Sequence, residues 1–241
     1  MQRPVPAIDA ILLDLYETLV WPDWTRLDAG RASLAARAGV DHAALREQWR
    51  RTHEARMRGT FGGLEADLAE MLDACGKRLE SDVLRDLAQH ECANWAEGVH
   101  LYGDVLPQLR RLRLRGLRLA IISNASCEAA SVVRTLGLDQ VVDEVVLSCE
   151  VGAIKPEPAI LYLVLERLDV APHRALLVDD AVVNLDAARA LGLHSALMVR
   201  TGGESRSVPD YPRISHLGDL WPLLRTLGEA PVPLGRALRP V

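Results

Sequence analysis

The stretch Ala10-Ile11-Leu12-Leu13-Asp14 is an unbroken apolar run that ends in a carboxylate. A short run of this kind is typical of a strand buried on both faces, as in a parallel sheet. Four later runs share the pattern, and three of them lead into polar residues. We therefore predict parallel strands of one sheet at residues 12–14, 117–123, 145–148, 175–179 and 196–199.

Helical patterns separate the later runs. Apolar residues recur at helical spacing in three stripes, within residues 105–112, 160–168 and 182–191. Strands that alternate with helices over residues 100–200 indicate βαβ units with right-handed crossovers. The fold class is therefore α/β, with a parallel sheet. A closing helix is expected at 217–227, a loop at 201–212 and a loosely held end at 231–241.

Residues 22–98 interrupt the alternation. They contain no convincing strand but several amphipathic helices, of which the clearest carries Leu64, Leu68, Met71, Leu72 and Cys75 on one stripe. We predict a helical cap over residues 22–98, inserted into a core made of residues 1–21 and 99–241. His53, Arg56 and Arg58 in this insertion are expected to form a solvated face.

Composition narrows the functional classes. The 241 residues carry a formal net charge of −5 and few aromatics other than five tryptophans, which argues against a nucleic-acid-binding surface. Four cysteines lie far apart and form no CxxC pair, which is typical of reduced thiols in the cytoplasm. No apolar run approaches the length of a membrane span, so no membrane partner is expected. The sequence indicates no oligomeric state.

Polar residues follow the buried strands where each strand ends. Asp14, Ser123-Asn124 and Asp179-Asp180 would meet at one edge of a parallel sheet, which is where ligands bind in such folds. Three carboxylates at one edge repel one another unless a cation lies between them, and Mg²⁺ prefers carboxylate oxygen. Lys155, held between Gly152 and two prolines, could balance an aspartate nucleophile and an anionic substrate.

These motifs, in this order, resemble the haloacid dehalogenase superfamily, in the subgroup whose cap lies between the first two motifs. The resembling segments are Asp14-Leu15-Tyr16-Glu17-Thr18-Leu19, Ile121-Ile122-Ser123-Asn124, Lys155-Pro156-Glu157-Pro158 and Leu177-Val178-Asp179-Asp180 with Asn184. The resemblance implies a Rossmann-like doubly wound parallel sheet with an inserted α-helical cap. One motif alone is weak, but four in order around a helical insertion are specific.

The resemblance also implies roles for individual residues. Asp14 would be the nucleophile, Ser123 would hydrogen-bond the transferred group, and Lys155 would be the catalytic residue of the third motif. Tyr16 is a further catalytic candidate, since its hydroxyl could hydrogen-bond the leaving oxygen. Mg²⁺ would be held by the Asp14 side chain, the Tyr16 carbonyl and the carboxylates of Asp179 and Asp180. Asn124, Thr18 and Arg26 are candidate substrate-binding residues, with Arg26 contributed by the cap. Trp21 and Trp24 are expected to pack the cap hinge.

Tyr16 departs from the pattern of the phosphatases, which carry Asp two residues after the nucleophile. That Asp protonates the leaving alkoxide, and general acid–base help is worth about 10²–10⁴-fold. Halide needs no proton, and haloacid dehalogenases resemble this sequence at Tyr16. The pair Asp179-Asp180 favours the opposite conclusion, because the metal-free dehalogenases carry Ser and Asn there. Glu17 could replace the missing acid, although alternation on extended backbone would point it away from the site.

We therefore expect a hydrolase with an aspartate nucleophile, and favour a Mg²⁺-dependent phosphatase of a small phosphorylated metabolite. A 2-haloacid dehalogenase is the first alternative. A catalytically weak binding protein is the second, for which Tyr16 is the main argument.

Overall fold

The computed structural model describes residues 8–200 and 211–229. Six strands form one sheet in the order β5-β4-β1-β6-β7-β8, and all neighbouring pairs are parallel. Their bounds are β1 (Ala10–Leu13), β4 (Arg118–Ser123), β5 (Glu144–Leu147), β6 (Ala175–Asp179), β7 (His194–Met198) and β8 (Arg213–Ile214). The five predicted strands are confirmed, with shifts of one or two residues at their ends. Ser148 opens a short helix instead of ending a strand.

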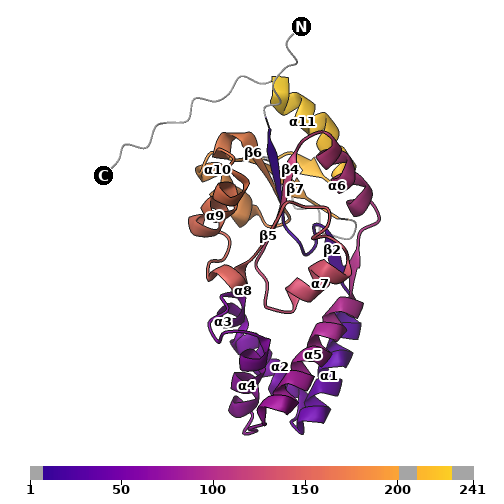
Figure 1. Ribbon diagram of the computed structural model, residues 1–241, viewed down its shortest axis with the longest axis vertical. Helices are drawn as coiled ribbons and strands as arrows, with labels where there is room; N and C mark the ends of the chain where they lie inside the picture. Colours follow the sequence, from indigo (N-terminus) through magenta and orange to yellow (C-terminus); the bar gives the residue numbers. More distant parts are fainter. Residues whose placement is uncertain (1–7, 201–210, 230–241) are drawn as a thin grey trace, which may run out of the picture.

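Helices cover both faces of the sheet, as the alternation of strands and helices predicts (Figure 1). Side chains of β1 alternate between two apolar clusters, with Ile11 and Leu13 in one and Ala10 and Leu12 in the other. The first cluster includes residues of α6 (Val105–Leu114), α7 (Ala129–Thr135) and α11 (Leu220–Glu229). The second includes residues of α9 (Pro158–Leu168) and α10 (Val182–Ala190). The doubly wound α/β fold is therefore confirmed.

The register of β1 explains why polar residues meet at one edge. Leu13 pairs with Ile121 of β4 on one side and with Val178 of β6 on the other. The residue that follows β1 is Asp14, and its amide donates a hydrogen bond to the Val178 carbonyl at 2.9 Å. Asp14 therefore lies beside the carboxyl ends of both neighbouring strands.

A helical part lies between β2 (Val20–Pro22) and β3 (Val99–Leu101), which pair antiparallel. Its helices are α1 (Trp24–Ala38), α2 (His42–Arg51), α3 (His53–Met57), α4 (Leu64–Ala74) and α5 (Ser81–Gly98), and Figure 1 shows them packed together beyond one end of the sheet. They share an apolar cluster of their own. Asp23 and Asp41 begin α1 and α2 by accepting hydrogen bonds from Arg26 N and Ala44 N. That these helices form a separate domain stays a prediction.

Several short elements were not predicted. β2 and β3 have three residues each and β8 has two, which is too short for periodicity to reveal. A 3₁₀ turn (Leu217–Asp219) and α11 occupy the region of the predicted closing helix. Apart from Tyr211 and Pro212, the expected loop at 201–212 and the end at 231–241 lie outside the described residues. Among the described helices, none has the length and apolarity that a membrane span requires.

Candidate active site

Asp14 and Lys155 form the centre of the site. Lys155 Nζ donates to Asp14 Oδ1 at 2.6 Å and to Asp179 Oδ2 at 2.6 Å, and all three side chains are buried. Burial raises the pKa of Asp14 to about 7, against the opposing attraction of Lys155 and with the help of repulsion from Asp179. Burial alone would lower the pKa of Lys155, but the two carboxylates raise it, so the ammonium stays charged.

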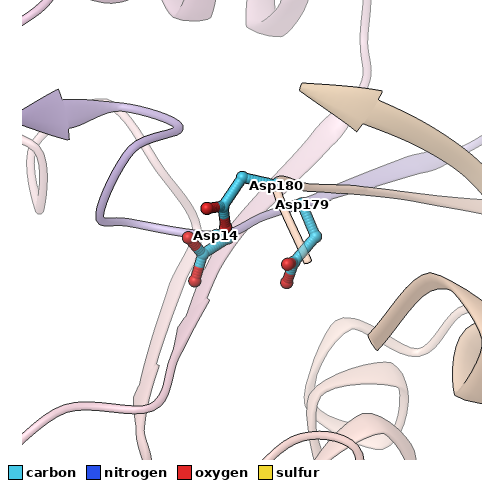
Figure 2. Close-up of side chains that lie close together, drawn as sticks. All are labelled: Asp14, Asp179 and Asp180. Atoms are coloured by element: carbon cyan, nitrogen blue, oxygen red, sulfur yellow. The ribbon is translucent and has the colours of Figure 1, made fainter. Parts of the chain in front are cut away.

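Three carboxylates gather where β1 and β6 end. Asp14, Asp179 and Asp180 each offer an oxygen to a group whose atoms all lie within 4.8 Å of one another, and Figure 2 shows these side chains together. We call these residues the carboxylate cluster. Asn184 of α10 donates to both oxygens of Asp179 at 3.0 and 3.1 Å, which orients that side chain. Burial, together with the charge of Asp179, raises the pKa of Asp180 to about 6.

The carboxylate cluster has the chemistry of a Mg²⁺ site. All its donors are hard oxygens, and the one ammonium bonded to the cluster, that of Lys155, faces three carboxylates. The residues therefore fit a divalent cation.

Asn124 is tied to the backbone of Lys155. Its amide donates to the Lys155 carbonyl at 2.7 Å and accepts from the Lys155 N–H at 2.7 Å. A side chain predicted to bind substrate thus also joins the second motif to the third.

Two buried hydroxyls near these residues lack hydrogen-bond partners among the described residues. Ser123 Oγ and Thr18 Oγ1 are buried and have no hydrogen-bond partner within the described ranges.

Tyr16 and Glu17 follow Asp14 closely in the sequence and line a larger cavity. The half-buried Tyr16 ring packs edge-on against Trp95, with centroids 5.7 Å apart. Burial and the charges of Glu128 and Asp14 raise the pKa of Tyr16 well above its ordinary value, so its hydroxyl stays protonated. Glu17 has a φ of +56°, a conformation that favours glycine, and its carboxylate accepts from Tyr102 Oη at 3.2 Å.

A cavity of about 550 Å³ adjoins these residues. Its lining comes from Tyr16, Glu17, Trp24, Asp28, Arg31, Arg46, Trp49, Arg50, His53, Arg56, Met57, Trp95, Asn124, Ala125, Ser126 and Glu128. We call it the cap cavity, because helices of the 22–98 insertion form most of it. Asn124 to Ser126 connect it to Ser123.

The structure does not bring Arg26 to this cavity. Arg26 is exposed and pairs with Glu97, and it is absent from the lining. The expectation that His53, Arg56 and Arg58 form a solvated face is wrong for Arg56, which is 2% exposed. Arg56 donates to the Trp49 carbonyl at 2.9 Å and to Thr52 Oγ1 at 3.2 Å. These acceptors compensate a buried charge that sequence spacing did not reveal.

Sequence reasoning also missed Arg31, Trp49, Trp95 and Glu128 of the cap cavity. The only signal in the sequence was that Arg31 and Glu91 lie on amphipathic helices. This signal is weak, because arginine and glutamate on such helices are ordinarily exposed. Trp24 lines the cavity, whereas Trp21 is absent from the lining and packs against the tilted ring of His100 at a centroid distance of 4.6 Å.

Comparisons with known proteins agree with this arrangement. The family model for haloacid dehalogenase-like hydrolases matches residues 8–192. Phosphatase MT3486 of Mycobacterium tuberculosis (strain CDC 1551 / Oshkosh) is 27% identical over 208 residues, which cover 81% of this chain and 89% of that protein.

Solved structures of two kinds resemble the fold. The 2-haloacid dehalogenase from Pseudomonas syringae pv. Tomato DC3000 has a TM-score of 0.68 at 22% identity, and the match covers 91% of this chain and 98% of that one. The enzyme BT-2542 from Bacteroides thetaiotaomicron, in complex with magnesium and inorganic phosphate, has a TM-score of 0.64 at 19% identity, covering 82% and 97%. These two likenesses show the fold alone.

Proposed function

The chain belongs to the haloacid dehalogenase-like hydrolase family, and from this premise we propose that it is a cytoplasmic, magnesium-dependent phosphatase of a small phosphorylated metabolite. The observation that carries the proposal is the carboxylate cluster of Asp14, Asp179 and Asp180. A second and a third carboxylate beside the nucleophile would repel an anionic haloacid. The same cluster suits a cation that brings a phosphate to Asp14.

In the proposed reaction, a carboxylate oxygen of Asp14 attacks the phosphorus atom and the substrate oxygen leaves. Water then hydrolyses the phosphoaspartate, which releases inorganic phosphate and restores Asp14. Lys155, bonded to Asp14 and Asp179, holds the nucleophile in place and contributes positive charge. The buried Ser123 hydroxyl, which has no partner in the described part of the chain, would donate to a phosphate oxygen.

Asp14, Asp179, Asp180 and the Tyr16 carbonyl would hold the Mg²⁺ ion. When bound, the ion supplies positive charge that offsets the carboxylates and the negative charge of the phosphate. Asn184 and Asn124 would act indirectly, because Asn184 orients the Asp179 side chain and Asn124 orients the backbone of Lys155.

Tyr16 is the one observation that favours a 2-haloacid dehalogenase instead. A phenol of raised pKa cannot serve as an efficient proton donor to an alkoxide, whereas a halide leaves unprotonated. A hydrolysis screen over phosphorylated metabolites and 2-haloacids, each with Mg²⁺ and with EDTA, separates the two reactions. We expect Mg²⁺-dependent release of phosphate. Metal-independent release of halide would overturn the proposal.

Mg²⁺ binding provides a second test. We expect Asp180→Asn and Asp179→Asn to weaken Mg²⁺ binding by about tenfold or more, because each removes a charged oxygen ligand. Isothermal titration calorimetry measures this directly. Asp139→Asn, on the exposed loop after α7, is the matched control and should bind as the wild type does. Equal affinity in all four proteins, or no binding to any, would contradict a metal site at the carboxylate cluster.

A further inference from the structure

One wall of the cap cavity is built from a guanidinium held against indole rings. The Arg31 Cζ atom lies 4.5 Å from the centroid of Trp49 and 5.5 Å from that of Trp95. A guanidinium at these distances from aromatic rings is attracted by the π-system and held in one orientation. Arg31 comes from α1, Trp49 from α2 and Trp95 from α5, so three helices are needed to build this wall.

Only part of the Arg31 hydrogen-bonding capacity is used. Its Nε donates to Glu91 Oε1 at 3.2 Å, and Glu91 is itself fixed by Trp95 Nε1 at 2.8 Å and by Asn94 Nδ2 at 3.4 Å. The side chain of Arg31 is 17% exposed. Its two terminal nitrogens donate to no residue within 8–200 and 211–229. A largely buried, oriented guanidinium with unused donors thus belongs to the cavity lining.

Arg56 adds a second cation to the same wall. Its Cζ atom lies 5.1 Å from the Trp49 centroid, and its Nε and Nη2 are bonded to Thr52 and Trp49. Nη1 has no hydrogen bond to any described residue, although the side chain is 2% exposed. Both cations of the wall therefore carry unused donors, Arg56 while nearly excluded from water and Arg31 while largely buried, and a hydrogen bond to an anion is stronger in such surroundings than in water.

Residues next to Asp14 and Ser123 in the sequence line the cap cavity together with the wall. Tyr16, two residues after Asp14, lines the cavity. Asn124 and Ala125, which follow Ser123, line it as well. A substrate whose phosphate lies at Asp14 would therefore extend past Tyr16 towards Arg31.

We propose that Arg31, assisted by Arg56, forms a subsite for a second oxyanion, a carboxylate or a second phosphate, at the far end of the phosphorylated substrate. The planar, apolar body between the two anions would lie along Trp49 and Trp95. A cavity of about 550 Å³ is far larger than a two- or three-carbon acid needs, which fits an extended substrate with charge at both ends. The subsite rests on the proposed phosphatase function for the position of the first anion.

Three aryl phosphates with closely matched leaving groups test the subsite. They are 4-methylphenyl phosphate, 4-(carboxymethyl)phenyl phosphate and 4-(phosphonomethyl)phenyl phosphate, which carry a neutral group, a carboxylate and a phosphonate at the far end. We expect kcat/KM to be about tenfold to a hundredfold higher for at least one of the charged esters than for the neutral one. Comparing the two charged esters identifies which oxyanion the subsite takes.

The variants remove the subsite without leaving a buried charge alone. In the double variant Arg31→Met with Glu91→Gln, kcat/KM for the charged ester should become about equal to kcat/KM for the neutral one. The change should appear in KM. Glu91→Gln alone should keep most of the preference. Arg37→Met, near the end of the same helix and bonded to His90, is the matched control and should behave as the wild type. No preference in the wild type, or an unchanged preference in the double variant, would overturn the subsite.

A binding measurement separates this inference from the phosphatase proposal. Titration of 4-hydroxyphenylacetate and of 4-methylphenol is followed by tryptophan fluorescence in the wild type and the double variant. Tighter binding of the carboxylate that depends on Arg31 supports the subsite even if no ester is hydrolysed, in which case the phosphatase proposal alone fails. Equal binding of the two phenols, or binding that does not depend on Arg31, rejects the subsite even if all three esters are hydrolysed.

Discussion

At the scale of single residues, the chemistry of Tyr16 limits what the site can do. It occupies the position of the acid that protonates a leaving alkoxide in the phosphatases it resembles, and burial keeps its hydroxyl protonated. The site can therefore donate a weak hydrogen bond there but cannot readily transfer a proton. Substrates with good leaving groups should react without that proton, and alkyl esters should not.

We predict that Tyr16→Asp accelerates alkyl phosphate hydrolysis by about 10²-fold, the low end of the range for general acid–base catalysis. Turnover of p-nitrophenyl phosphate should change much less, because p-nitrophenolate leaves without a proton. Steady-state rates on one aryl and one alkyl phosphate measure the difference. Asp14→Asn should abolish both activities.

The same series identifies any acid that replaces the missing one. Should Tyr16→Asp leave alkyl phosphate turnover unchanged, another group already donates the proton, and Glu17 is the nearest candidate in the chain. Glu17→Gln would then lower alkyl turnover alone. A Tyr16→Asp enzyme that loses release of chloride from 2-chloropropionate would instead support the dehalogenase, since a carboxylate would repel the departing anion.

At the scale of elements, the loop after α3 joins the helical part to the sheet. Ser148, which opens α8 (Ser148–Val151), donates from Oγ to the Met57 carbonyl at 2.6 Å and accepts from Ala125 N at 2.9 Å. Arg58 forms a two-point ion pair with Glu157, at 2.6 and 3.2 Å. The loop thereby contacts the segments that carry Ser123 and Lys155.

Gly59 allows this close approach. A Cβ atom there would lie 2.0 Å from the Cys149 carbonyl oxygen, and its φ is +63°. An alanine side chain at position 59 would clash with the Cys149 backbone, which cannot move without a cost in free energy. The left-handed backbone conformation adds a second cost.

We predict that Gly59→Ala lowers the free energy of unfolding by about 1–3 kcal/mol more than Gly76→Ala does. Gly76 is the matched control, because its φ is +76° and no atom lies within 4 Å of its Cβ position. Gly76→Ala should cost about 1 kcal/mol for the backbone conformation alone. Urea unfolding curves of the three proteins measure both effects, and equal losses would show that the contact with Cys149 relaxes freely.

At the scale of the whole molecule, buried carboxylates set how stability depends on pH. Asp67 of α4 is fully buried, and neither of its oxygens has a hydrogen-bond partner in the described part of the protein. Burial raises the pKa of Asp67 to about 6 from 3.8, despite the attraction of Arg56. The folded protein therefore binds this proton more tightly than the unfolded chain, and stability is lost as the pH rises through that interval.

We predict that Asp67→Asn increases the free energy of unfolding at pH 7 by about 2 kcal/mol relative to the wild type, and that the gain disappears near pH 4. Asp73→Asn on the same helix should instead lower the free energy of unfolding at pH 7, because the pairing with Arg78 lowers the pKa of Asp73. Urea unfolding between pH 4 and pH 7 yields both difference curves. A difference between Asp67→Asn and the wild type that does not vary with pH would contradict the raised pKa.

Much of the fold, and the grouping of Asp14, Asp179 and Asp180 at one edge of the sheet, could be predicted from the sequence. Apolar runs that end in Asp14, Ser123 and Asp179 indicate buried parallel strands. Neighbouring parallel strands have their carboxyl ends at the same edge of the sheet. Lys155 follows no predicted strand, and it was singled out by the prolines that follow it and by the resemblance of its segment to the third motif. Each of these inferences depends on a short window of sequence, or on a topology that leaves few alternatives.

Only the tertiary structure decided the cap cavity. Arg31, Trp49 and Trp95 lie on three helices, and their convergence depends on how those helices pack, which local periodicity does not specify. Arg56 was predicted to be solvated, because an arginine on a helix surface is exposed unless other elements cover it and supply acceptors. Glu17 was expected on extended backbone, whereas its φ is +56°, and the residue lines the cap cavity while its carboxylate accepts from Tyr102. The grouping of Asp14 and Asp179 thus follows from local sequence and sheet topology, while the cap cavity depends on packing between distant segments.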